Sequence, residues 1–465
     1  MKKTKINNTL SSSFRDPSGF LFYRNGFLYR QINIGYKDNY DLLMESGLYG
    51  ALVKDGLLIP HKETSDQKIE NKNVYKIIKP EVINFVSYPY EWCFSQLKNA
   101  ALVTLAIQKK SLEFGMSLKD ANAYNIQFKD GRPLLIDTLS FEKYQEGKPW
   151  IAYKQFCQHF LAPLALMSYK DIRFNKLLQI YLDGIPLDLA SSLLPRKAYY
   201  KISLLSHIKF HAKSQQHFSD RKINMNKHRM SRLSLQGLID NLENSIKGLK
   251  WQPVGTEWAD YYEETNYSGA SMQHKKQIVD KFLEKIKPKN LWDLGANTGA
   301  FSQIAADKGI STISFDIDPA VVEKNYLRCV KQGEKNILPL IIDLTNPSPS
   351  IGWENKERLS LPERGPADAV LALALIHHLS ISNNLPFNKI AHFFNKICNY
   401  LIIEFIPKND SQIQKLLLNR EDIFTDYTQQ DFEREFNKYF IIQKSIEIND
   451  SKRSLYLMQK KDANS

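Results

Sequence analysis

Short apolar runs and longer amphipathic stretches alternate along the second half of the chain. The apolar runs have the length of β-strands and lie at residues 290–294, 311–317, 337–343, 367–376 and 400–407. Helical periodicity fills the stretches between them at 299–308, 319–332 and 387–398. Gly309 and Gly333 follow the first two stretches, at the position where helices commonly end. The alternation predicts an α/β domain with a parallel sheet.

The end of the chain carries a different pattern. Two further amphipathic stretches, 412–419 and 429–439, predict helices. Two apolar runs, 440–448 and 454–458, then flank Asn449-Asp450, a pair of residues favoured in tight turns. We therefore expect the sheet to close with a hairpin whose last strand is reversed.

The first apolar run opens through glycines into a helix, in the sequence Leu-Trp-Asp-Leu-Gly-Ala-Asn-Thr-Gly-Ala-Phe from Leu291 to Phe301. Glycine adopts backbone conformations that other residues avoid, and the first N–H groups of the following helix lack partners. These features predict a ligand-binding loop. A dinucleotide fingerprint requires Gly-x-Gly-x-x-Gly, but Asn297 occupies the place of its middle glycine, between Gly295 and Gly299.

Each of the first three apolar runs ends in an aspartate: Asp293, Asp316 and Asp343. Asp316 follows the glycine loop by about 20 residues, where a nucleotide-binding βαβ unit places its ribose-binding carboxylate. Because parallel strands end at one edge of an open sheet, and ligands bind at that edge, the three carboxylates predict one cofactor site.

The Asp-x-Gly-x-x-x-Gly loop and the acids after it resemble class I S-adenosylmethionine-dependent methyltransferases. The resemblance implies a Rossmann-like, seven-stranded sheet and S-adenosyl-L-methionine as cofactor. It further implies that Asp293 and the Gly295–Gly299 loop, with Asn297, hold the methionine end. Asp316 would accept from the ribose hydroxyls and Asp343 from the adenine amino group.

Four residues after strands four and five are candidates for the methyl-transfer step. His377 and His378 follow the fourth strand, and a histidine with a pKa near neutral suits a general base. The alternative is that this pair is scaffold. Glu404 and Lys408 lie at the end of the fifth strand and are candidates for catalysis and for the acceptor site, respectively.

Three aromatic residues are candidates for covering the substrate. Tyr262 and Tyr267 precede the first strand, and Trp353 lies in a loop at 345–366 that is longer than ordinary βα loops. Packing is the alternative role for the tyrosines. The chain has no Asn-Pro-Pro-Tyr or Asp-Pro-Pro-Tyr after strand four, and no cysteine placed to attack a pyrimidine ring. Transfer to oxygen or nitrogen of a small molecule, sugar or protein therefore remains.

The first half of the chain predicts an α+β domain. Asn25-Gly26 between two apolar runs is a strong hairpin signal. We expect helices over 40–52, 90–114, 151–167 and 174–182, and β-structure over 57–60 and 74–86.

The segment from Lys119 to Asp137 carries a second group of polar residues. Asp120, Asn125 and Asp137 resemble the catalytic loop and metal-binding strand of protein-kinase-like phosphotransferases, which implies a magnesium-binding role and a kinase-like fold. The segment departs from that pattern, because no histidine precedes the loop aspartate, Thr138-Leu139 replaces Phe-Gly and no glycine-rich phosphate loop lies upstream. The alternative is that Asp120 and Asn125 shape a loop and Asp137 caps a turn.

Length and charge suggest how the chain is divided. A chain of 465 residues exceeds one ordinary domain. The basic excess behind its net charge of +13 lies before residue 251. The expected parts are a disordered tail (1–13), the α+β domain (14–195), a basic helical linker (196–250) and the methyltransferase domain (251–465). The basic run at 196–232 is either a solvated linker or a nucleic-acid contact.

Cysteine usage and hydropathy favour a soluble cytoplasmic protein without a metal centre. The four cysteines have no Cys-x-x-Cys spacing, and neither a signal peptide nor a membrane-length apolar run is present.

The stretches Ala-Leu-Ile-His-His-Leu, Glu-Phe-Ile-Pro-Lys and Lys-Asp-Ala-Asn-Ala-Tyr-Asn also resemble a bacterial methyltransferase-like family associated with nodulation proteins. That resemblance covers most of the chain and implies no particular acceptor.

Overall fold

The computed structural model describes residues 9–64, 72–210, 229–253, 269–418 and 421–462. The chain divides into two units. The first comprises Met1–Trp251 together with Ser350–Arg358, and the second comprises Gln252–Pro349 and Leu359–Ser465.

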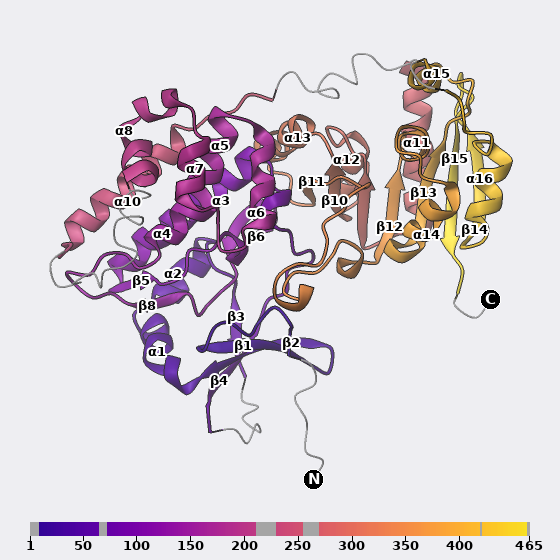
Figure 1. Cartoon of the computed structure of the whole chain (residues 1–465). Coiled ribbons are helices and arrows are strands. Elements are labelled where there is room, and N and C mark those ends of the chain that lie inside the picture. Colours follow the sequence, from indigo (N-terminus) through magenta and orange to yellow (C-terminus); the bar gives the residue numbers. More distant parts are fainter. Residues whose placement is uncertain (1–8, 65–71, 211–228, 254–268, 419–420, 463–465) are drawn as a thin grey trace, which may run out of the picture. The chain divides into compact units, whose positions relative to one another are not determined.

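The first unit begins with a four-stranded antiparallel sheet of order β1-β2-β4-β3 (Figure 1). Its strands are β1 (Gly19–Arg24), β2 (Phe27–Asn33), β3 (His61–Glu63) and β4 (Val74–Pro80). The turn between β1 and β2 has positive φ at both Asn25 (52°) and Gly26 (79°). Positive φ at both central residues is what a tight hairpin requires, so the predicted hairpin is confirmed.

The helix expected over residues 40–52 is wrong as a single element. The structure has α1 (Lys37–Glu45) and α2 (Leu48–Lys54), which are separated at Gly47 with φ of 85°. A left-handed residue cannot continue a right-handed helix, and glycine adopts this conformation without a steric penalty.

A long helix, α3 (Phe94–Glu113), follows the sheet. After it come four short strands, β5 (Met116–Leu118), β6 (Ile126–Lys129), β7 (Arg132–Leu135) and β8 (Phe141–Lys143). They pair as two antiparallel ribbons, β5 with β8 and β6 with β7. The remaining helices are α4 (Tyr153–Phe156), α5 (Ala162–Tyr169), α6 (Leu177–Ile180), α7 (Leu187–Leu193), α8 (Ile202–Leu204) and α10 (Arg232–Lys247). The helix expected over 151–167 contains a π-helical turn at Cys157–Leu161.

A short piece of the long loop at 345–366 belongs to the first unit. Within it, the buried carboxylate of Glu357 pairs with Arg15 at 2.7 Å. The Arg358 guanidinium lies 4.6 Å from the centre of the Tyr124 ring. The first unit therefore includes chain that is distant in sequence from the rest of it.

We expect Arg358→Ala to lower the free energy of unfolding of the first unit by about 1–2 kcal/mol, because a partly desolvated cation over an aromatic ring contributes about that much. Thermal unfolding followed by circular dichroism measures the effect. The matched control is Lys356→Ala, since the Lys356 ammonium pairs with the exposed Glu354. An equal loss in both variants would contradict the expectation.

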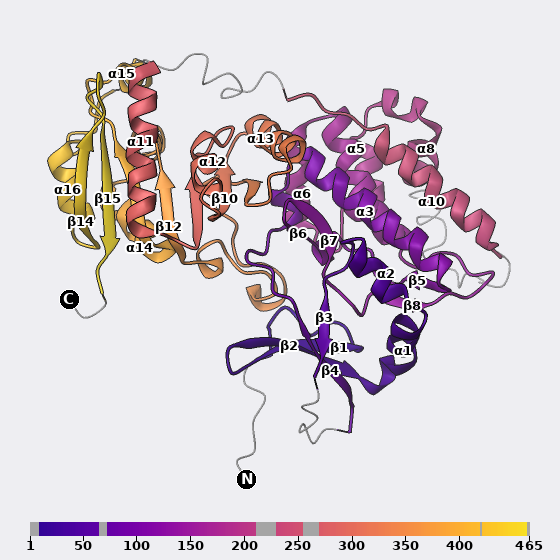
Figure 2. The same ribbon diagram turned by 180° about the vertical axis from the view of Figure 1, so that it is seen from behind.

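The second unit is built on a seven-stranded sheet of order β11-β10-β9-β12-β13-β15-β14 (Figure 2). Its strands are β9 (Asn290–Leu294), β10 (Ser311–Asp316), β11 (Ile337–Ile341), β12 (Ala367–Ala372), β13 (Cys398–Phe405), β14 (Phe440–Glu447) and β15 (Ser454–Lys460). The first five are parallel, and β15 is antiparallel to both β13 and β14. The predicted sheet with a reversed last strand is confirmed.

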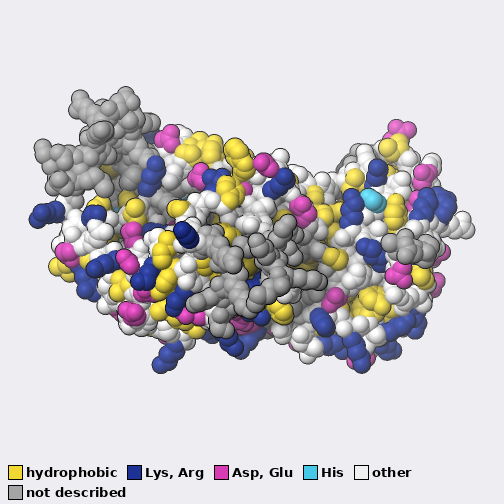
Figure 3. Space-filling model, turned by 90° about the horizontal axis from the view of Figure 1, so that it is seen from below, with side chains coloured by type: hydrophobic (Ala, Val, Ile, Leu, Met, Phe, Trp, Pro, Cys, Tyr) yellow, Lys and Arg dark blue, Asp and Glu magenta, His cyan; other side chains and the backbone are white. Residues whose placement is uncertain are grey.

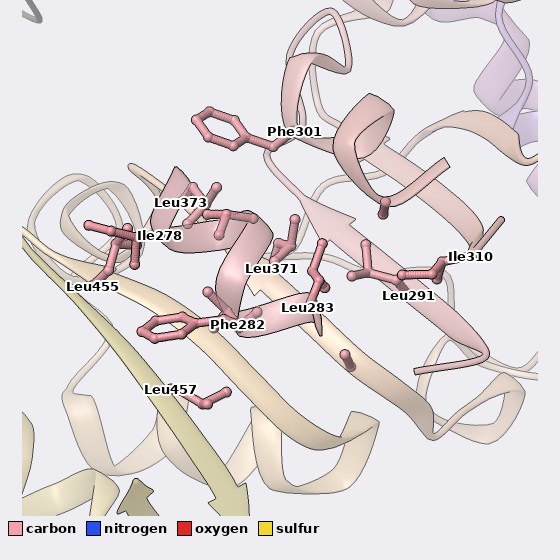
Figure 4. Packing of buried hydrophobic residues seen from close by; sticks show 14 of the residues in the cluster. Ile278, Phe282, Leu283, Leu291, Phe301, Ile310, Leu371, Leu373, Leu455 and Leu457 are labelled. Carbon is pink, nitrogen blue, oxygen red and sulfur yellow. The ribbon is translucent and has the colours of Figure 1, made fainter. Parts of the chain in front are cut away.

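Helices cover both faces of this sheet. The helices of the unit are α11 (Gly269–Ile286), α12 (Ala300–Ala306), α13 (Pro319–Gln332), α14 (Phe387–Ile397), α15 (Ser411–Leu417) and α16 (Gln429–Phe436). On one face, Ile278 and Phe282 of α11 share a buried cluster with Leu455 and Leu457 of β15 (Figure 4). On the other face, the ring of Tyr456 packs against Phe432 of α16 at 5.1 Å. Successive β15 residues thus face opposite layers, as a strand buried on both sides requires.

All four cysteines, Cys93, Cys157, Cys329 and Cys398, are buried and unbridged. In the described ranges, every helix is too short or too polar to cross a lipid bilayer.

Candidate cofactor site

A cavity of about 310 Å³ opens in the second unit where the parallel strands end. Segments that directly follow β9, β10, β11 and β12 contribute to its wall. Its polar lining consists of Lys275, Asp293, Asn297, Asp316, Asp343, Thr345, His378, Ser382 and Asn383. This edge is where open α/β sheets bind ligands, so the strand order places the three predicted aspartates around one space.

The glycine loop has the backbone that its sequence predicts. Gly295, Asn297 and Gly299 have φ of 77°, 51° and 82°, respectively. A Cβ atom on Gly299 would lie 2.6 Å from the side chain of Asn325, so both the backbone angle and the packing require glycine there. Gly295 and Asn297 line the cavity.

Asp316 holds the glycine loop to the end of β10. One carboxylate oxygen accepts the Asn297 N–H at 2.8 Å and the other accepts the Asp318 N–H at 3.0 Å. Burial raises the pKa of Asp316 to about 6. Each carboxylate oxygen accepts more than one hydrogen bond, so capacity remains for a ligand in the cavity.

Asp293 is also buried, and it accepts the Ser302 hydroxyl at 2.7 Å. Burial raises its pKa to about 6, and the neighbouring Asp316 adds to that shift. Asp343 is more open, and it accepts the backbone N–H and the hydroxyl of Thr345 at 2.8 Å and 2.6 Å. Three acceptor groups, two of them in dry surroundings, therefore face the cavity.

The two candidate histidines have different surroundings. His378 lines the cavity, and burial lowers its pKa to about 4. His377 is buried outside the cavity wall, its ring 4.0 Å from that of His378. Its Nδ1 has no hydrogen-bond partner within the described chain, and burial lowers its pKa well below 6.5. At neutral pH both rings are uncharged, and of the two only His378 lines the cavity.

The structure places Glu404 behind the cavity wall. The residue is fully buried, and its carboxylate accepts the Lys275 ammonium and the Ala374 N–H, each at 2.7 Å. Lys275, on α11, does line the cavity, and sequence reasoning missed it. A signal was available: Lys275 interrupts the apolar face that Ile278, Val279 and Phe282 form on this helix.

The other acceptor candidates do not line this cavity. Lys408 pairs with Asp422 at 2.8 Å. Trp353 belongs to the piece of loop that forms part of the first unit, and 65% of its side chain is exposed. Tyr262 and Tyr267 lie outside the described residues.

The structure brings Asp120, Asn125 and Asp137 together in the first unit. Asn125 donates to Asp120 at 3.0 Å, and the pKa of Asp120 is raised by burial and by the charge of Asp137. Arg30 pairs with Asp137 at 2.6 Å. Asp137 also accepts the Leu139 N–H at 2.9 Å, which is the turn-capping role. Among the described residues, no group of three or more His, Cys, Asp or Glu side chains is arranged to hold a metal ion.

Comparisons with solved structures give low overall similarity. Magnesium protoporphyrin IX methyltransferase (ChlM) from Synechocystis PCC 6803 with bound SAM is 14% identical, with a TM-score of 0.30, over 43% of this chain and 89% of that one. WbdD with the kinase inhibitor LY294002 is 12% identical, with a TM-score of 0.30, over 43% of each chain. A parallel five-stranded core extended by a hairpin with a reversed seventh strand is the class I methyltransferase fold.

No family model matches the chain. One curated protein matches along its length: the nodulation protein NoeA of Rhizobium meliloti (strain 1021) is 35% identical over 463 residues, which cover 97% of this chain and 96% of that protein. At this identity, across nearly the whole of both chains, the protein belongs to the NoeA family, and the strand order of its second unit is that of the class I methyltransferase fold.

Proposed function

We propose that the protein is an S-adenosyl-L-methionine-dependent methyltransferase that acts on an oxygen or nitrogen of a small molecule, sugar or protein. One observation carries the proposal. Asp293, Asp316 and Asp343 lie at, or within two residues of, the ends of three neighbouring parallel strands and line a single cavity together with the Gly295 turn. When bound, the cofactor supplies an activated methyl group, so the protein's task is binding, orientation and proton removal.

The residues fit this cofactor in size and chemistry. Asp316 offers two oxygens to adjacent ribose hydroxyls, and Asp343 offers an acceptor to an adenine amino group. Asp293 offers a buried negative charge to the methionine ammonium. The rest of the wall is largely apolar and includes Phe301 and Phe315, which suits the cofactor's uncharged surface.

Calorimetric titration of the full chain with S-adenosylmethionine tests the proposal. We expect a one-to-one complex with a dissociation constant of roughly 1 mM or below. Folded protein that takes up no cofactor would overturn the assignment. A screen of hydroxyl and amine acceptors by methyl transfer then follows.

For the proton-removal step we infer that His378 is the base. Its ring lines the cavity and is uncharged at pH 7, so it can accept a proton, and the burial that lowers its pKa to about 4 makes it a weaker base than a histidine with a pKa near neutral. Once an acceptor is identified, His378→Ala should lower kcat by about 100-fold, the usual contribution of a general base. His392→Ala, at an exposed position on α14, is the control. An unchanged kcat in the His378 variant would contradict the role.

A phosphotransferase in the first unit is the second candidate, and the convergence of Asp120, Asn125 and Asp137 favours it. The Arg30–Asp137 ion pair must open before Asp137 takes a magnesium ion. Magnesium-dependent ATP binding that Asp137→Ala abolishes would support this activity. Absence of binding to the wild type leaves the three residues as the structural loop and cap.

RNA methylation is a further alternative, in which the basic stretch before residue 251 would contact phosphates. On the face shown in Figure 3, the described Lys and Arg side chains are interspersed with acidic ones and do not form one patch. Much of the basic run, residues 211–228, lies outside the described residues. RNA affinity that falls steeply with salt would favour this acceptor class.

A further inference from the structure

Lys275 is a buried cation in the wall of the cofactor cavity, and nothing in the binding scheme above uses it. The residue is 2% exposed, and its ammonium donates to Glu404 at 2.7 Å. It also lies 4.9 Å from the centre of the Phe301 ring, which lines the same cavity. The ammonium is therefore fixed at the cavity rather than free to reach solvent.

A charge at this position requires a reason. The neighbouring positions on the same face of α11, Ile278, Val279 and Phe282, are apolar and join the core. Burying a lysine and a glutamate as a pair usually gives no net stability over apolar residues of similar volume. A methionine or leucine at position 275 would thus satisfy the packing, and packing alone does not explain a lysine there.

Buried polar contacts hold the carboxylate of Glu404, the partner of Lys275, in place. The Glu404 oxygen that accepts Lys275 also accepts the Ala374 N–H at 2.7 Å. The other Glu404 oxygen faces Arg453 at 3.8 Å, and Arg453 is held by two contacts with Asp410, at 2.8 Å and 3.0 Å. This network orients the ammonium from behind, as supporting residues do for a binding group.

The cavity presents both signs of charge. Asp293 supplies a carboxylate and Lys275 an ammonium. Burial lowers the pKa of Lys275, and the charges of Glu404 and Asp293 oppose that shift. The methionine end of the proposed cofactor carries an ammonium and a carboxylate on one carbon. The opposite pair in the wall is complementary to that zwitterion.

We propose that Lys275 binds the carboxylate of the cofactor's methionine end, with Glu404 as the residue that positions it. The proposal rests on the proposed function. An ammonium has three donor hydrogens, so Lys275 donates to Glu404 and to a second carboxylate at once.

The test compares three ligands by calorimetry: S-adenosylmethionine, its decarboxylated analogue and 5′-methylthioadenosine. Wild-type protein should bind S-adenosylmethionine about 10- to 100-fold more tightly than the decarboxylated compound, as expected for a charge-assisted hydrogen bond. Lys275→Met should remove most of that preference while changing the affinity for the decarboxylated compound by less than about 3-fold.

Lys275→Met alone leaves the Glu404 carboxylate buried without its cation, which destabilises the fold. Lys275→Met combined with Glu404→Gln removes both charges at nearly constant volume and is the second variant. Lys281→Met, at an exposed position of the same helix, is the control and should keep the wild-type preference.

The outcomes separate this proposal from the proposed function. Wild-type protein that binds neither S-adenosylmethionine nor 5′-methylthioadenosine would overturn the methyltransferase assignment and the role of Lys275 with it. Wild-type binding with no preference for the carboxylate, or a double variant that keeps the preference, would overturn the role of Lys275 alone. An equal loss of affinity for all three ligands in the Lys275→Met variant would also overturn it, because such a loss indicates a purely structural lysine.

Discussion

Asp316→Ala should weaken S-adenosylmethionine binding by at least about 100-fold, because two hydrogen bonds to a charged acceptor contribute about 1.5–3 kcal/mol each. The substitution removes the acceptor for the ribose hydroxyls. It also removes the acceptors of the Asn297 and Asp318 N–H groups, which hold the glycine loop against β10. Calorimetry on wild type and variant measures the loss directly.

Two further variants test whether the loss of affinity comes from the change in the cofactor site. Asp307→Ala, at the exposed end of α12, changes a carboxylate outside the cavity and should leave the affinity unchanged. Asp316→Asn keeps one acceptor oxygen and should fall between the wild type and the alanine variant. Wild-type affinity in folded Asp316→Ala would remove Asp316 from the cofactor site.

Cofactor affinity should also fall steeply as the pH drops below about 6. Burial raises the pKa of both Asp293 and Asp316 to about 6, so both carboxyls are neutral at pH 5 and charged at pH 7.5. Binding of a cationic, hydroxyl-bearing ligand favours the charged carboxylates. Because binding is coupled to the loss of two protons, the affinity should decrease by up to about 100-fold per pH unit well below pH 6. Asp293→Asn should reduce this dependence to one proton.

The same two groups set a stability trend in the empty protein. Their pKa values are higher in the folded chain than the ordinary value of 3.8, so the folded state binds these protons more tightly. Their contribution to stability is complete below about pH 3.8 and is lost as the pH rises through about 6. Asp293→Asn should therefore stabilise the empty protein at pH 7.5 and have little effect at pH 4, while it weakens cofactor binding. Thermal unfolding of wild type and variant at both pH values measures the effect. Equal shifts in the unfolding temperature at pH 4 and pH 7.5 would contradict this explanation.

Much of the second unit could be predicted from the sequence because its signals are local. Apolar runs of strand length, helices with glycine behind them and an acid at the end of each strand depend on short stretches of chain. The positive φ of Gly295 and Gly299 follows from the residue type. Parallel strands joined by helices then bring Asp293, Asp316 and Asp343 to one edge of the sheet.

Other features depend on contacts between segments far apart in the sequence. Glu404 ends its strand as expected, but its side chain turns to Lys275 on α11, 129 residues earlier, and away from the cavity. His377 and His378 are adjacent in sequence, yet of the two only His378, at which a π-helical turn begins, lines the cavity. No local pattern reports such choices.

The sequence by itself determined the order of strands and helices, the glycine turn and the acids that end the strands, because these depend on backbone preference and on alternation of polarity. Tertiary structure alone decided which polar side chains share the cavity and which lie behind it. It also decided that Ser350–Arg358 folds with the first unit. The physical reason is that burial, ion pairing and pKa are properties of a side chain's neighbours in space, which the sequence supplies only after the chain has folded.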